Sequence, residues 1–125
     1  AAYAEHQGAF GLVCNTFITE EAIRAIKETV EIPLVYTVVS EQTDVAGKLA
    51  AGVDFLNVSG AARTPEIVAH IREKFPEVPI IATGGPTDDT IRATIEAGAN
   101  AITYTPPTSA ELFSESMRKY RGKFA

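Results

Sequence analysis

The residue pattern best suited to chemistry is the short run Thr83-Gly84-Gly85-Pro86, which follows an apolar segment. Two adjacent glycines allow backbone N–H groups to approach an anion, because no Cβ atom stands in the way. The next segment opens with Thr87-Asp88-Asp89, a typical helix start, and a helix N-terminus attracts negative charge. The first three residues of the run are therefore predicted to bind phosphate. The alternative is that the glycines only shape a tight turn from strand to helix.

Polar residues that follow other apolar segments are candidates to contact a ligand. Asn15 follows the first such segment, and Ser59 and Arg63 follow the third. A guanidinium such as that of Arg63 can bind a phosphate or a carboxylate through two parallel hydrogen bonds. The alternative for Arg63 is a solvated position near a helix start. Asn57 lies inside an apolar strand candidate, where it either contacts a ligand or needs a partner in the core.

Residues for catalysis are sparse. Glu41 and Asn57 are the candidate catalytic residues, although Glu41 also fits the first turn of a helix. All five lysines fall in expected helices or in the tail, which disfavours Schiff-base chemistry, because that chemistry needs a desolvated lysine on a strand. Cys14 has no visible basic partner and is interpreted as a buried, inert thiol. We expect no metal site and no cofactor, since no cluster of metal-ligating residues appears.

These residues must be positioned by a chain that alternates between strands and helices. The strand candidates are short, apolar and rich in β-branched residues: Phe10–Cys14, Leu34–Val39, Phe55–Val58, Ile80–Thr83 and Ala101–Tyr104. Several of the helix candidates carry apolar residues at helical spacing, and their approximate bounds are Glu20–Val30, Glu41–Ala51, Pro65–Phe75, Asp88–Ala97 and Ala110–Arg121. Strands buried on both faces have this composition, and the alternation predicts an α/β fold with a parallel sheet.

Helix ends are marked by residues with capping chemistry. The threonines Thr19, Thr87 and Thr108 precede acidic residues and are predicted N-caps, and Thr64 precedes a proline at a helix start. Two glycines, Gly52 and Gly98, stand where a left-handed residue would end a helix.

An internal repeat supports the same architecture. Residues 31–37 (EIPLVYT) match residues 77–83 (EVPIIAT), and residues 51–56 (AGVDFL) match residues 97–102 (AGANAI). Both matches have an offset of 46 residues, so that one period spans two βα units. A repeated βαβα unit predicts a parallel sheet with right-handed crossovers.

Composition and charge narrow the classes of function. The 125 residues include 11 basic and 16 acidic ones, and a net charge of −5 disfavours a nucleic-acid surface. No apolar run approaches the roughly 20 residues of a membrane span. The single cysteine excludes an intrachain disulfide and agrees with a cytoplasmic location. The length fits one domain, residues 1–125.

A resemblance to known proteins rests on Pro79–Pro86 and Ala97–Ile102. Together they resemble the seventh and eighth units of phosphate-binding TIM barrels such as thiamine phosphate synthases, keto-deoxy-sugar-phosphate aldolases and glycerol-3-phosphate-responsive antiterminators. The resemblance implies that the five strands are the fourth to eighth of a (β/α)8 barrel, and that Thr105 joins the phosphate site. The chain departs from the pattern, because Pro86 and the pair Pro106-Pro107 supply no N–H donors.

Two architectures remain open at this point. One is a partial (β/α)8 barrel of about five βα units, and the other is a flavodoxin-like open five-stranded parallel sheet. A partial barrel has open strand edges, so we expect a homo-oligomer or a complementing N-terminal half. The expected function is the phosphate-binding half of a barrel that acts on or senses a small phosphorylated metabolite or an inorganic anion. A non-catalytic regulatory or structural half-barrel is the alternative.

Overall fold

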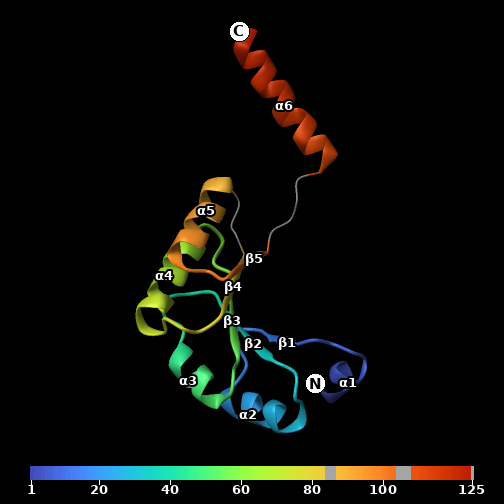
Figure 1. Ribbon diagram of the computed structural model, residues 1–125, viewed down its shortest axis with the longest axis vertical. Helices are drawn as coiled ribbons and strands as arrows, with labels where there is room; N and C mark the ends of the chain where they lie inside the picture. Colours follow the sequence, from blue (N-terminus) through green and yellow to red (C-terminus); the bar gives the residue numbers. More distant parts are fainter. Residues whose placement is uncertain (84–86, 104–107, 125) are drawn as a thin grey trace.

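The computed structural model describes residues 1–83, 87–103 and 108–124. Its strands are β1 (Leu12–Cys14), β2 (Leu34–Val38), β3 (Phe55–Val58), β4 (Ile80–Thr83) and β5 (Ala101–Thr103). Its helices are α1 (Ala2–His6), α2 (Glu20–Thr29), α3 (Val45–Ala51), α4 (Thr64–Lys74), α5 (Asp88–Ala97) and α6 (Ser109–Phe124), and a 3-10 turn, Ala61–Arg63, precedes α4. The strands form one sheet in which all neighbours are parallel (Figure 1).

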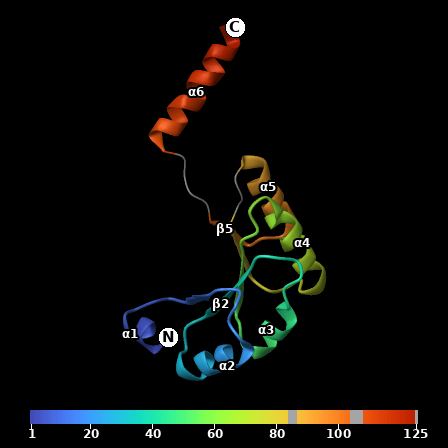
Figure 2. The same ribbon diagram turned by 180° about the vertical axis from the view of Figure 1, so that it is seen from behind.

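The strand order decides between the two architectures. A flavodoxin-like sheet has the order 2-1-3-4-5 with helices on both faces. Here the order is β1-β2-β3-β4-β5, and α2, α3, α4 and α5 all lie on one side of the sheet (Figures 1 and 2). Sequential parallel strands with an outer layer of helices are the arrangement of a (β/α)8 barrel. The sheet is not closed, because β1 and β5 are its two edges.

The core lies between the sheet and its helices. Alternate strand residues face the helices, since successive side chains of a strand point to opposite faces. Leu34, Leu56 and Ile80 are fully buried on this face, against residues of α2 and α4 such as Ile23 and Val68. Each such side chain contributes about 1.5–3 kcal/mol when it is buried. The three central strands are therefore the most firmly held part of the sheet.

Within the described strands, the opposite face of the sheet carries no charged side chain. Its residues follow from the register and fall into rows across neighbouring strands: Val13, Val35 and Phe55, then Thr37, Asn57, Ile81 and Ala101, then Thr83 and Thr103. The first rows are largely apolar, whereas hydroxyl groups gather toward the C-terminal ends of the strands. In a closed barrel this face is the interior.

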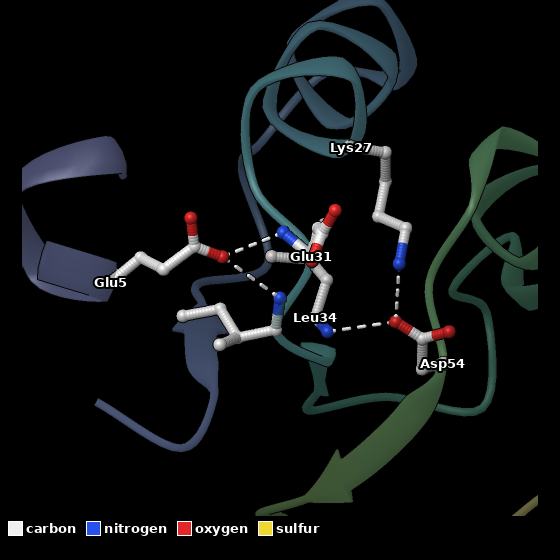
Figure 3. Close-up of polar contacts among 6 residues, drawn as sticks. Glu5, Lys27, Glu31, Leu34 and Asp54 are labelled. Carbon is white, nitrogen blue, oxygen red and sulfur yellow. Dashed lines mark hydrogen bonds and ion pairs between the residues drawn. The ribbon is translucent and has the colours of Figure 1, made fainter. Parts of the chain in front are cut away.

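The internal repeat appears in the structure as two matching clamps at the N-terminal edge of the sheet. In the first, Asp54 Oδ2 accepts hydrogen bonds from Leu34 N (2.9 Å) and from Lys27 Nζ (2.7 Å; Figure 3). Glu5 extends this clamp from α1, since its Oε2 accepts from Glu31 N (2.6 Å) and from Ile32 N (3.2 Å). The clamp fixes the entrance of β2 against that of β3.

The second clamp lies 46 residues further along the chain. Asn100 Oδ1 accepts hydrogen bonds from Ile80 N (2.9 Å) and from Arg72 Nη2 (2.6 Å). Ile80 and Asn100 thus repeat the roles of Leu34 and Asp54, with an amide in place of the carboxylate. The N-terminal face of a barrel serves stability rather than chemistry, and the clamps agree with that division.

Most capping predictions are confirmed. Thr19 accepts a hydrogen bond from Ala22 N, and Thr87 accepts one from Thr90 N. Thr108 and Glu111 form a reciprocal capping box, with distances of 3.0 and 3.1 Å. Gly52 and Gly98 end α3 and α5 with φ angles of +125° and +117°.

Three sequence predictions are wrong in detail. The helix expected at Glu41–Ala51 begins only at Val45, because Asp44 caps it by accepting from Gly47 N (3.1 Å). Glu41 therefore lies in the preceding loop and not in a helix first turn. Pro65, expected at the first helical position, is the second residue of α4, because the helix begins at Thr64, whose Oγ1 accepts from Gly60 N. The short helix α1 was not predicted from the sequence.

Candidate functional site

The C-terminal ends of β2 and β3 frame a hollow of about 380 Å³. Its wall combines the loop after β2, the loop after β3 and the first turns of α4: Val39, Ser40, Glu41, Gln42, Gly60, Arg63 and Ile67. In barrels and in open α/β sheets alike, ligands bind at this end of the strands. The hollow is thus at the edge where a site is expected, opposite the two clamps.

Arg63 and Glu41 meet in this hollow although they are 22 residues apart. Arg63 Nη2 lies 3.2 Å from Glu41 Oε1 and 3.0 Å from Glu66 Oε2, and its Nε donates to the same Glu66 oxygen. The Arg63 side chain is 68% exposed, so water screens these ion pairs. An incoming anion can therefore replace Glu41 as the partner of the Arg63 guanidinium at a small cost in free energy.

The loop between β3 and α4 is held in an unusual conformation. Ala61 has a φ of +52°, in the left-handed region that side-chain-bearing residues rarely adopt. The loop is tied at both sides, because Ser59 N donates to Val38 O (2.9 Å) and Gly60 N donates to Thr64 Oγ1 (3.0 Å). Strained residues of this kind cluster at binding sites. Nothing in the sequence points to Ala61, since alanine is not typical of left-handed positions.

A second group of polar side chains lies at the ends of β4 and β5. Thr83 and Thr103 are paired in the register, and their Oγ1 atoms lie 3.5 Å apart. The helix that follows β4, α5, begins after its cap Thr87. Of the other predicted phosphate ligands, Gly84, Gly85 and Thr105 lie outside the described residues. Thr103 was not among the predicted ligands.

Asn57 and Asn15 have different surroundings. Asn57 is partly exposed on the uncharged face, between Thr37 and Ile81 of the neighbouring strands. In the described part of the chain its side chain has no hydrogen-bond partner, so its amide is available to a ligand. Asn15 instead shapes its own loop, because its Oδ1 accepts from Phe17 N (2.9 Å).

Cys14 packs against the core at the end of β1. Burial raises the pKa of the Cys14 thiol, so less of the reactive thiolate forms near neutral pH. Within the described ranges, no group of three or more histidine, cysteine or acidic residues could hold a metal ion. In the same ranges, no helix is long and apolar enough to cross a membrane.

The chain is similar to known proteins in sequence and in structure. The chain is 29% identical over 94 residues to a thiamine-phosphate synthase of Geobacillus thermodenitrificans (strain NG80-2), a match that covers 66% of this chain and 42% of the synthase. A solved structure described as native KDPGal superposes with a TM-score of 0.63 at 18% identity, over 81% of this chain and 48% of that one. Inosine 5′-monophosphate dehydrogenase of Legionella pneumophila superposes with a TM-score of 0.64 at 20% identity, over 83% and 34%.

The chain is a partial (β/α)8 barrel. Its five strands follow in barrel order, its helices cover one face, and its sequence and structural matches span less than half of each known protein. No protein family model matches the sequence. The solved structures share the fold at low identity, and the resemblance to thiamine phosphate synthases agrees with the sequence match.

Proposed function

We propose that this partial barrel binds the phosphate group of a small phosphorylated metabolite at the C-terminal ends of β4 and β5. The observation that carries the proposal is the pairing of Thr83 with Thr103, whose hydroxyl groups are 3.5 Å apart at this edge. Two adjacent hydroxyls can donate to two oxygens of one phosphate. The Gly84-Gly85 pair that follows Thr83 in the sequence adds backbone donors of the kind that phosphate loops use.

Two further features support a ligand at this edge. The hollow beside β2 and β3 holds Arg63 at the same end of the sheet, where the guanidinium can bind a second acidic group of the metabolite. The relative found by sequence is named for a phosphate ester, thiamine phosphate. A phosphorylated metabolite with a carboxylate or a second phosphate fits this pair of anion-binding groups.

Titration of the amide NMR spectrum with inorganic phosphate, against chloride at matched ionic strength, tests the proposal. We expect saturable shifts centred on Thr83, Thr87 and Thr103. Thr83→Val should weaken binding about ten- to a hundredfold, since a hydrogen bond to a charged group contributes about 1.5–3 kcal/mol. Thr29→Val removes an exposed threonine of α2 and should leave the affinity unchanged. A dispersed spectrum without saturable shifts at β4 and β5 would exclude the site.

Binding without catalysis is the second candidate function, and the ion pair between Glu41 and Arg63 favours it. Glu41 is the one carboxylate in the described lining of the hollow, and the guanidinium that faces it at 3.2 Å offers hydrogen-bond donors but no second acid–base group. A sensor needs only ligand binding at this edge. If Glu41→Gln abolishes turnover of a phosphorylated substrate but keeps its binding, the enzyme is favoured; binding without turnover in the unaltered protein favours the sensor.

A further inference from the structure

Most of the exposed apolar side chains belong to the segments that flank the two edge strands in the sequence. Among the described residues, nine large hydrophobic side chains are exposed. Four belong to residues 3–17, which include β1, and four belong to the helices before and after β5 in the sequence: Tyr3, Phe10, Val13 and Phe17, then Ile95 of α5 and Leu112, Phe113 and Tyr120 of α6. Only Val39 lies at a central strand. Exposed large apolar side chains in such number are typical of surfaces that contact another molecule.

In the part of the chain that the structure describes, β1 and β5 are edge strands, so one side of each has no neighbouring strand. All five strands are parallel, so the free side of β5 can pair with the free side of another β1 without reversing direction. We call such a pairing of β5 with β1 a junction. In a dimer with a two-fold axis, β5 of each copy pairs with β1 of the other, so the dimer has two identical junctions. The uncharged face, which includes Val13, Asn57 and Ile81, is then enclosed by the resulting ring of strands.

The two ends of the chain carry opposite charge. Residues 1–31 contain five glutamates against one arginine and one lysine, a net charge of −3. Residues 108–125 contain four basic residues against two glutamates, a net charge of +2. A junction that brings the β5 end of one chain to the β1 end of another places these charges together, whereas two like ends would repel.

The last helix, α6, does not pack on the sheet within the described residues (Figures 1 and 2). Figures 1 and 2 show α6 standing away from the sheet, with Leu112 49% and Phe113 67% exposed. In a barrel, the helix after a strand packs over that strand and the next one. Leu12 and Cys14 of β1 are only partly buried on the helix side of the sheet. They offer α6 of another copy the surface that a next strand would supply.

We propose that two copies of this chain associate head to tail, so that β5 and α6 of each copy cover β1 of the other. Sedimentation equilibrium and native mass spectrometry at about 50 μM test this. We expect a single species of twice 13.3 kDa. A folded monomer at this concentration would overturn the proposal. A ladder of larger species would overturn the closed pair, because it indicates an open-ended chain of junctions.

Two variants, one for each edge, test which surfaces meet. Val13→Lys charges the β1 edge, and Phe113→Asp charges α6; both positions are exposed in the single chain, so both variants should fold. Each should weaken dimerisation at least tenfold. Ala69→Lys places the same positive charge as Val13→Lys on the exposed surface of α4, and it should leave the dimer intact.

Mixing the two variants separates a head-to-tail dimer from every like-to-like one. In a mixed dimer, the unaltered α6 of the Val13→Lys chain meets the unaltered β1 of the Phe113→Asp chain. The second junction contains both changed surfaces. Head-to-tail association therefore predicts more dimer in the mixture than in either variant alone. If the mixture is as monomeric as its components, or if Ala69→Lys disrupts the dimer equally, the assignment of the surfaces is wrong.

Discussion

At the scale of single residues, Asp54 joins α2, β2 and β3 through one carboxylate. Its Oδ2 accepts from Lys27 Nζ and Leu34 N, and its own N–H donates to Leu34 O (2.8 Å). Asp54→Ala removes the acceptor and leaves the Leu34 N–H at the buried sheet entrance without its partner. We expect the free energy of unfolding in urea to fall by about 1–3 kcal/mol, the cost of an unmade hydrogen bond at a buried group.

The second repeat provides the control for this prediction. Asn100 performs the same role at Ile80 with an amide oxygen, so Asp54→Asn should keep the backbone hydrogen bond and lose only the ion pair with Lys27. Exposed ion pairs contribute about 1 kcal/mol or less. If Asp54→Asn is as destabilising as Asp54→Ala, the ion pair rather than the hydrogen bond holds the clamp.

At the scale of elements, Gly98 determines how α5 turns into β5. Its φ of +117° is strained for any residue with a side chain, and an added Cβ would lie 2.8 Å from Arg72 Cγ. Gly98→Ala therefore strains the backbone and pushes Arg72 away from its bond to Asn100. We expect a loss of about 1–3 kcal/mol in the free energy of unfolding, measured by urea denaturation.

Gly8→Ala is the matched substitution for Gly98→Ala. Gly8 also has a positive φ, +91°, but an added Cβ there meets nothing within 4 Å. Gly8→Ala should cost only the conformational strain, about 1–2 kcal/mol. Equal losses for the two variants would mean that the contact with Arg72 adds nothing to the role of Gly98.

At the scale of the whole molecule, the open sheet predicts uneven stability. Leu34, Leu56 and Ile80 of the central strands are fully buried, whereas Val13 of β1 is 68% exposed. Amide hydrogen exchange at low protein concentration should therefore be slowest in β2, β3 and β4 and faster in β1 and β5. Uniform protection of all five strands in dilute solution would contradict the open sheet.

Dimerisation adds a concentration dependence to the same measurement. If β5 of one copy pairs with β1 of another, exchange at these two edges should slow as the protein concentration rises, while the central strands stay unchanged. In Val13→Lys the edges should remain fast at every concentration. Edges that respond to concentration in Val13→Lys as they do in the unaltered chain would contradict the proposed contact.

The sequence by itself determined the features that depend on interactions between residues close together in the chain. The caps Thr19, Thr87 and Thr108 and the turn glycines Gly52 and Gly98 are confirmed, because their hydrogen bonds and φ angles depend on residues within about four positions. The strand composition and the repeat of 46 residues likewise predict the α/β alternation and the parallel sheet. Loop residues such as Glu41 were misplaced, since a cap three residues away, Asp44, decided where the helix begins.

Only the tertiary structure decided the strand order, the open face and the neighbours in the site. A strand pattern is the same in an open flavodoxin-like sheet and in a barrel, so the choice depends on which strands pair. The contacts of Glu41 with Arg63 and of Thr83 with Thr103 join residues 22 and 20 positions apart. The first contact joins the loops that follow two neighbouring strands, and the second follows directly from the strand register. That register is fixed by burial of one face along the whole strand and not by any local motif.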